Sequence, residues 1–267
     1  MRVELRDEPD QLVLEGDGFA YGFDRNSGLL ASISAGGEEL MLSPLAPTFW
    51  RAPTDNDFGN YMHEWAAVWE QAGRNRSLVE FSHRQDDDGS VTVDAIYGFH
   101  DEEGWEVARW HAQYTMAETG KLHVANRFRR EDGLPVMPRV GMNMEVVSRL
   151  GHAAWFGRGP HENYRDRRLS AHVGLYHAPV AELYVPYMRP QENGYRTGVR
   201  RLELFEEVPP AGPASGAGIA IQADSVFSFS AHHNRMEDFI PPVKIAITSE
   251  DGPGARENTE RVNVHVN

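Results

Sequence analysis

Apolar and polar residues alternate along several short stretches of this chain. In the clearest one, positions 91–99, every second residue is apolar or aromatic, and most residues between them are polar or small. Side chains of a β-strand point alternately to the two faces of a sheet, so a period of two predicts a half-buried strand. The same period recurs at 122–128, 219–221 and 262–266.

Clusters of turn-forming residues separate these stretches, at 86–89, 117–120 and 209–213. A stretch rich in Pro, Gly and Ala at 208–218 is interpreted as a long hairpin loop. All-β sandwiches often reach roughly 200–250 residues as one unit, and the chain has 267. We therefore predict a single all-β domain over residues 1–267, built as a large antiparallel sandwich.

One segment has a helical pattern instead. Asn60 is a suitable N-cap, and Gly73 is a suitable stop signal. The residues between them form an apolar stripe at helical spacing, namely Tyr61, Trp65, Val68, Trp69 and Ala72. We predict one short helix that covers the sandwich.

Composition and charge narrow the classes of partner. The hydrophobic fraction of 40% is enough for a sizeable core, and there is no cysteine for a disulfide or a thiolate metal site. A net charge of −14 argues against binding to nucleic acid or to an anionic membrane. The basic positions Arg127, Arg129 and Arg130 are interpreted as a solvated strand face. Cytoplasm and periplasm both stay open as compartments.

The first polar cluster, at 49–59, places Asp55, Asn56, Asp57 and Gly59 directly before the predicted helix. An EF-hand loop starting at Asp55 would need glycine sixth and glutamate twelfth, and neither is there, so that calcium motif is rejected. Side chains that bond back to their own turn are the favoured interpretation. Contact with a ligand is the alternative.

The second cluster, at 155–166, begins as Gly157-x-Gly159 but has Glu162 where a dinucleotide-binding loop needs glycine. Nucleotide binding is therefore rejected. Aromatic residues beside carboxylates and amides suit sugar recognition, and a buried polar knot between strands is an equal alternative. The predicted sugar-binding or structural polar cluster joins residues of all three segments, which are Arg51, Glu162, Asn163, Tyr164, Glu192 and Asn193.

The third cluster, at 187–196, contains Asn193-Gly194, a strong turn signal. A hydrolytic pair of Glu162 and Glu192 is disfavoured, because sequence shows no spacing of roughly 5–9.5 Å between two carboxyl groups. His232 and His233 are adjacent and would point to opposite faces of a strand. We therefore interpret them as structural rather than as metal ligands.

Taken in order, these motifs resemble the C-terminal domain, or small-chain type, of the large bacterial β-galactosidases of glycoside hydrolase family 2. The matching segments are 23–30, Arg51-Ala52-Pro53, Asp55-Asn56-Asp57-x-Gly59, 139–141, Gly157-x-Gly159-Pro160-x-Glu162-Asn163-Tyr164-x-Asp166-Arg167, Tyr184-x-Pro186-Tyr187 and Pro190-x-Glu192-Asn193-Gly194. The resemblance implies an antiparallel supersandwich similar to that of galactose mutarotases.

The same resemblance implies that the chemistry lies elsewhere, in a retaining barrel domain that carries the catalytic glutamates and the magnesium and sodium sites. We therefore expect no catalytic residue, metal or cofactor in this chain. The loop with Asp55, Asn56, Asp57 and Gly59 is expected to border the galactoside pocket. The family domain continues past the position of Asn267, so the chain is expected to be excised and trimmed at its C-terminus.

The function predicted from these features is that of an accessory domain, which shapes the active-site wall and contributes to a homo-oligomer. Its partners would be the barrel and sandwich domains of the parent chain and the galactoside substrate. One alternative is a free-standing aldose 1-epimerase, in which Glu162, Glu192 and several histidines could serve as base and acid. Another is a galactoside-binding module without catalysis, suggested by Trp50, Trp155 and Tyr187.

Overall fold

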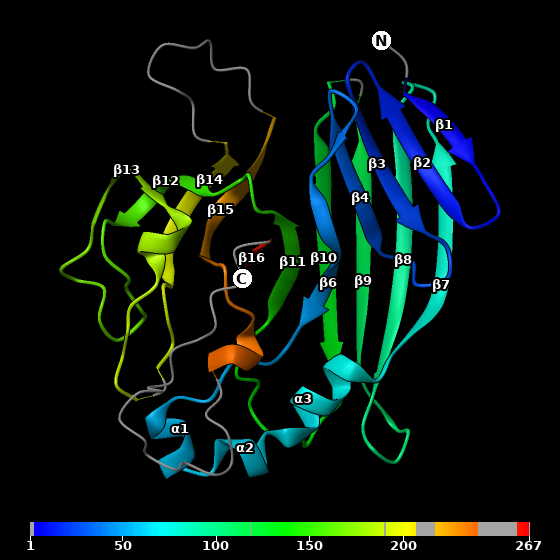
Figure 1. The fold of residues 1–267 in the computed structure, drawn as a ribbon. Helices are drawn as coiled ribbons and strands as arrows, with labels where there is room; N and C mark the ends of the chain where they lie inside the picture. The colour runs from blue at the N-terminus through cyan, green and yellow to red at the C-terminus, as the bar shows by residue number, and fades with distance from the viewer. Residues whose placement is uncertain (1–2, 118, 190, 207–216, 240–260, 267) are drawn as a thin grey trace, which may run out of the picture. The chain divides into compact units, whose positions relative to one another are not determined.

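The computed structural model describes residues 3–117, 119–189, 191–206, 217–239 and 261–266. The chain divides into two compact units. The first contains residues 1–50 and 65–140, and the second contains residues 51–64 and 141–267. Both units are built mainly from antiparallel strands, which confirms the predicted all-β class (Figure 1). The assignment of 1–267 to one domain stays a prediction.

The first unit contains two antiparallel sheets. One has the strands β1 (Glu4–Asp7), β2 (Gln11–Gly16), β3 (Phe19–Asp24), β4 (Leu30–Ala35) and β6 (Met41–Thr48) in that order, and β5 (Glu38–Glu39) pairs with β4. The other has the order β10 (Leu122–Arg130), β9 (Glu106–Met116), β8 (Val91–His100) and β7 (Arg76–Gln85). In Figure 1 the blue strands of the first sheet lie in front of the cyan and green strands of the second.

Large aromatic side chains join these two sheets into a sandwich. Phe23 of β3 meets the ring of Tyr114 on β9 edge to face, with 5.0 Å between centroids. Tyr97 of β8 donates a hydrogen bond of 2.7 Å to the Gly28 carbonyl. The predicted strand at 91–99 is confirmed, because its odd positions are all buried in this core. Each such side chain contributes roughly 1.5–3 kcal/mol by leaving water.

The predicted strand at 122–128 is also confirmed, as β10. Its basic residues Arg127, Arg129 and Arg130 are exposed, as expected for a solvated face. The turns at 86–89 and 117–120 connect antiparallel neighbours, and Gly89 and Gly120 adopt the positive φ angles of 84° and 79°. The turn at 209–213 and most of the loop at 208–218 lie outside the described residues.

The predicted helix is wrong in its start and its continuity. Three short helices occupy the region, namely α1 (Asp55–Gly59), α2 (Met62–Trp65) and α3 (Ala67–Arg74). Asn60 caps the C-terminus of α1 instead of starting a helix, and Tyr61 has a φ of 60°, which interrupts the helical path. Of the predicted stripe, Trp69 and Ala72 are buried, whereas Tyr61 and Trp65 are exposed.

Helix α3 belongs to the first unit and is held there by Trp69. The indole Nε1 donates to the Pro135 carbonyl at 3.0 Å, and the ring meets Phe49 edge to face. None of the helices in the described parts of the chain is long and apolar enough to span a bilayer.

The second unit has one antiparallel sheet with two short 3-10 helices. Its strand order is β11 (Gly141–Val147), β16 (Arg261–Val266), β15 (Gly218–His232), β14 (Arg196–Phe205), β12 (His152–Gly159) and β13 (His172–Pro179). The helices are η1 (Val180–Leu183) and η2 (Met236–Phe239). The stretches predicted at 219–221 and 262–266 are confirmed as parts of β15 and β16.

Candidate functional site

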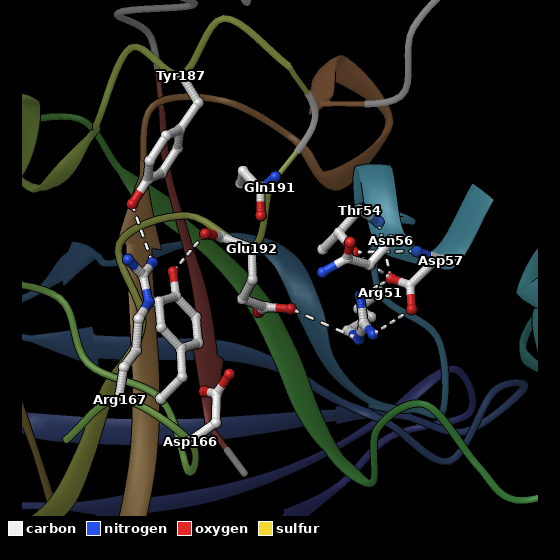
Figure 2. Close-up of a pocket in the computed structure, with 10 residues that line it drawn as sticks. Arg51, Thr54, Asn56, Asp57, Asp166, Arg167, Tyr187, Gln191 and Glu192 are labelled. Atoms are coloured by element: carbon white, nitrogen blue, oxygen red, sulfur yellow. Dashed lines mark hydrogen bonds and ion pairs between the residues drawn. The ribbon is translucent and has the colours of Figure 1, made fainter. Parts of the chain in front are cut away.

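A polar cavity of about 490 Å³ lies in the second unit. Three segments form it, which are the approach to α1 with its first turn, the loop after β12, and the loop between η1 and β14 (Figure 2). The lining residues are Arg51, Thr54, Asn56, Asp57, Tyr164, Asp166, Arg167, Tyr187, Gln191 and Glu192.

The structure brings together only part of the predicted site. Of the expected pocket wall, Asn56 and Asp57 line the cavity, and Asp55 and Gly59 are not among its lining residues. Of the predicted polar cluster, Arg51, Tyr164 and Glu192 line it. The other three members, Glu162, Asn163 and Asn193, support the lining loops through the hydrogen bonds described below.

Arg51 and Asp57 form the core of one wall. The guanidinium and the carboxylate make a two-pronged ion pair, in which Arg51 Nη2 lies 2.9 Å from Asp57 Oδ1. Asp57 also accepts from the backbone N–H of Thr54 at 2.8 Å, while Thr54 Oγ1 accepts from the Asp57 N–H at 3.3 Å. This reciprocal capping box starts α1. The structural interpretation of the Asp-Asn-Asp turn is therefore favoured for Asp57.

The contacts of Asp57 also set its protonation state. Burial alone raises the pKa of this carboxyl, but the hydrogen bonds and charge of Arg51 and the hydrogen bonds from Thr54 bring it below its ordinary value. Asp57 is therefore ionised at neutral pH. Because its carboxylate accepts hydrogen bonds from Arg51 and Thr54, Asp57 fixes the position of this wall of the cavity.

Two ion pairs connect the loop between η1 and β14 to the α1 region. Arg51 Nε lies 3.7 Å from Glu192 Oε2, and Figure 2 shows the Glu192 carboxylate directed at Arg51. Arg189 lies 3.1 Å from both carboxylate oxygens of Asp55. The Arg189 side chain is 74% exposed, so its pair with Asp55 contributes little stability.

Glu162 is the centre of a polar knot behind the cavity. Its carboxylate accepts from the Gly194 N–H at 2.9 Å, from Arg167 at 2.7 Å and from the Tyr187 hydroxyl. The Tyr164 hydroxyl lies 3.1 Å from the same carboxylate. Residues far apart in sequence are thereby fixed to one nearly buried group.

Tyr164 is a rigid member of the cavity lining. Its hydroxyl also bonds to the Glu192 carbonyl, and its ring stacks on Tyr195 with 5.7 Å between centroids. The Arg167 guanidinium covers the ring at 4.5 Å from its centroid. Burial, followed by the charges of Glu162 and Glu192, raises the pKa of Tyr164 well above its ordinary value. The phenol is therefore a neutral hydrogen-bond donor.

Asn163 and Asn193 clamp the two loops to their neighbours. The fully buried Asn163 accepts from the Thr197 N–H at 3.1 Å and from its hydroxyl at 2.6 Å. The amide of Asn193 accepts from the Val185 N–H at 2.9 Å and donates to the Val185 carbonyl at 2.7 Å. Of the two interpretations of these clusters, the polar knot is favoured for Glu162, Asn163 and Asn193.

Gly194 and Arg196 continue this knot toward β14. Gly194 has a φ of 63°, and a Cβ there would lie 2.3 Å from the His232 ring, so only glycine fits without movement. Arg196 donates to the Gly194 carbonyl at 2.6 Å and lies 5.2 Å from the centroid of the Trp155 ring. Burial lowers the pKa of Arg196 to about 10, so it stays charged at neutral pH.

The arrangement disfavours several catalytic interpretations. Glu162 is occupied by its donors, which leaves it poorly suited to act with Glu192 as a hydrolytic pair or as an epimerase base. His232 Nε2 lies 2.9 Å from the Asn193 carbonyl, and His233 Nδ1 lies 2.8 Å from the Arg261 carbonyl, in agreement with their structural interpretation. Within the described ranges, no three His, Asp or Glu side chains are grouped to hold a metal ion.

Two of the three aromatic residues that suggested a binding module cannot contact a sugar. Trp50 and Trp155 are buried, so neither can present its ring face to a sugar. Tyr187 does line the cavity. Four lining residues were not selected from the sequence as candidate site residues, which are Thr54, Asp166, Arg167 and Gln191. For Thr54 a signal existed, because Thr three residues before Asp resembles a capping box.

Comparison with known proteins assigns the chain to a family. The sequence model described as β-galactosidase small chain matches residues 15–241, which is most of the chain and includes all of the cavity lining. The chain belongs to the β-galactosidase small-chain family. This confirms the family that the sequence motifs indicated.

Curated relatives of this family member are named β-galactosidases. One from Priestia megaterium is 33% identical over 71% of this chain and 18% of its own length. One from Vibrio cholerae is 33% identical over 75% of this chain and 20% of its own length. The chain thus spans about a fifth of the length of the relatives it matches.

Solved structures add little to this assignment. A galactose 1-epimerase from Lactobacillus acidophilus is 12% identical, covers 100% of this chain and 96% of its own, and has a TM-score of 0.34. A mutarotase of Salmonella typhimurium described as putative is also 12% identical, over 99% of this chain and 85% of its own, with a TM-score of 0.38. Scores this low carry no argument about the finer architecture.

Proposed function

We propose that this chain is an accessory domain of a β-galactosidase, in which it forms part of the wall of the galactoside pocket. The parent enzyme hydrolyses terminal β-galactosides with a retaining mechanism, and its barrel supplies the catalytic glutamates and the magnesium and sodium sites. This chain alone is inactive in hydrolysis. It contacts the barrel and sandwich domains of the parent and contributes to a homo-oligomer.

The cavity is the observation that carries this proposal. Asn56 and Asp57 in its lining belong to the segment that the family motif is expected to bring to the pocket mouth. Asn56 and Gln191 offer uncharged amides to a sugar hydroxyl. Arg51 forms ion pairs with both Asp57 and Glu192, so the three side chains present a preorganised polar wall. Preorganised groups lose less entropy on binding than mobile ones.

A chimera tests this function. The matched segment of the Priestia megaterium β-galactosidase is replaced by this chain, and hydrolysis of o-nitrophenyl β-galactoside is followed. We expect a folded chimera to hydrolyse the substrate. Asn56→Ala in the chimera should raise KM by roughly three- to tenfold, as expected for the loss of about one hydrogen bond.

Two controls make the result interpretable. Asn26→Ala alters an exposed asparagine of the first unit and should leave KM unchanged. A soluble, folded chimera without hydrolysis contradicts the accessory function. An active chimera whose KM is the same with and without Asn56→Ala contradicts the proposed place of the cavity in the substrate pocket.

A further inference from the structure

Most of the charged side chains that line the cavity are already paired. Arg51 donates from Nη1 and Nη2 to Asp57 and places its Nε 3.7 Å from the Glu192 carboxylate. Arg167 donates at 2.7 Å to Glu162, which lies behind the cavity. These side chains therefore shape the cavity, and their charges are largely compensated without a ligand.

Three lining side chains make no hydrogen bond or ion pair with any residue that the structure describes. They are Asn56, Asp166 and Gln191. Figure 2 accordingly draws no interaction from the Asp166 carboxylate or the Gln191 amide. The two amides can each donate and accept, whereas the carboxylate only accepts. A ligand that complements all three must therefore carry several hydrogen-bond donors.

The Asp166 carboxylate belongs to a turn that is fixed at both ends. The Arg167 N–H donates to the Tyr164 carbonyl at 3.1 Å and closes this turn. The Tyr164 hydroxyl and Arg167 Nη2 lie 3.1 Å and 2.7 Å from the carboxylate of Glu162. The polar knot thus holds the backbone on which Asp166 stands. An acceptor held in this way loses less entropy on binding than a mobile one.

The cavity gives a sugar both room and access to these groups. Its volume of about 490 Å³ falls within the roughly 300–1,000 Å³ of known small-molecule sites. Asn56 and Asp166 are exposed as well as part of the lining. A ligand therefore reaches them directly from solvent.

The charges around the cavity disfavour an anionic ligand. The charged lining residues are Arg51, Arg167, Asp57, Asp166 and Glu192. Carboxylates thus outnumber guanidinium groups, and the nearly buried Glu162 adds another carboxylate behind the lining. A second anion placed beside Asp166 would meet a carboxylate that has no ion pair among the described residues, and the two would repel each other.

We infer that Asp166 selects the ligand of the cavity by its charge. The Asp166 carboxylate accepts hydrogen bonds from sugar hydroxyls, and Asn56 and Gln191 bind further hydroxyls of the same sugar. The cavity thus admits neutral and cationic sugars and rejects those that carry a carboxylate or a phosphate. This inference rests on the proposed function for the galacto configuration of the ligand, and adds the residue that discriminates.

Competitive inhibition of the active chimera tests the inference. D-Galactosamine, D-galactose and D-galacturonate share one ring configuration and are cationic, neutral and anionic at slightly acidic pH. Asp166→Asn should weaken D-galactosamine and tighten D-galacturonate by about threefold each, as expected for one charge in a water-filled cavity. The barrel of the chimera is the same in both proteins, so these changes belong to Asp166.

A second variant tests direct contact rather than charge alone. Asp166→Ala should weaken neutral D-galactose by about tenfold, through the loss of a hydrogen bond to a charged acceptor. Because the exposed Asp166 side chain holds no described residue, both variants should fold normally. The matched control Asp224→Asn removes an exposed carboxylate of β15 outside the cavity lining. It should change none of the three inhibition constants.

The inference is overturned if Asp166→Asn moves D-galactosamine and D-galacturonate in the same direction or moves neither, or if Asp166→Ala leaves D-galactose unchanged. A folded chimera without hydrolysis contradicts the proposed function instead. The three sugars are then titrated into the isolated chain, with the side-chain amide resonances of Asn56 and Gln191 as the readout. There, a response to D-galacturonate as strong as to D-galactosamine, or no response to any sugar, overturns the inference.

Discussion

Replacing Glu162 by Ala should selectively destabilise the second unit. The carboxylate is 8% exposed and holds the Gly194 N–H, the Tyr187 hydroxyl and Arg167. A buried donor left without an acceptor costs roughly 1–3 kcal/mol, and a partly buried hydroxyl roughly 0.5–1.5 kcal/mol. Arg167 is 52% exposed, so water replaces most of the stabilisation that its ion pair with Glu162 provides. We expect a loss of about 2–4 kcal/mol in unfolding free energy.

Urea unfolding followed by fluorine NMR of 5-fluorotryptophan separates the two units. Trp155 is the sole tryptophan of the second unit, and Trp110 reports on the first. With a urea slope of about 2 kcal/mol per molar, the midpoint at Trp155 should fall by roughly 1–2 M. Trp110 should respond less.

A matched control and a conservative variant decide the interpretation. Glu182→Ala removes an exposed carboxylate from η1 of the same unit and should change stability by less than about 0.5 kcal/mol. Glu162→Gln keeps one acceptor oxygen and should lose less than Glu162→Ala. The reasoning is refuted if Glu162→Ala is no more destabilising than Glu182→Ala.

Three further predictions concern the residues around the cavity. Gly194→Ala should destabilise the second unit by more than about 1 kcal/mol in thermal unfolding, from the positive φ and the contact with His232. Gly73 of α3 has no neighbour within 4 Å of an added Cβ, so Gly73→Ala should be neutral or stabilising by up to about 1 kcal/mol. If Gly194→Ala and Gly73→Ala change stability equally, the explanation from the positive φ and the His232 contact is contradicted. The lowered pKa of Asp57 means that its contribution is complete above the unfolded value of about 3.9 and is lost as pH falls through the folded value. Asp57→Asn should therefore flatten the acid limb of stability against pH, and an unchanged limb would show that Asp57 is not the titrating group. Arg189→Ala should change stability by less than about 0.5 kcal/mol in urea, since its pair with Asp55 is exposed, and a loss above about 1 kcal/mol would mean that the pair holds the loop.

Local patterns in the sequence were enough for β8, β10 and parts of β15 and β16, and for the family. The alternation at 91–99 reports burial on one face directly, and β8 follows it. The turn residues were found for the same reason, since Gly89 needs its positive φ whatever surrounds it. The family motifs were visible because many of them are short and ordered along the chain.

Features that depend on distant contacts were not accessible in this way. The break at Tyr61 depends on a positive φ that no local propensity favours. The clamp of Asn193 on Val185 and the four donors around Glu162 join segments separated by up to 32 residues. The burial of both faces of β16 likewise arises from neighbours that alternation cannot reveal.

Hydrolysis of o-nitrophenyl β-galactoside by the purified chain alone tests the central claim most directly. The Priestia megaterium β-galactosidase serves as the positive reference under the same conditions. If the chain is an accessory domain whose parent holds the catalytic glutamates, its rate should not exceed that of the buffer blank. A rate comparable to that of the whole enzyme would contradict the account.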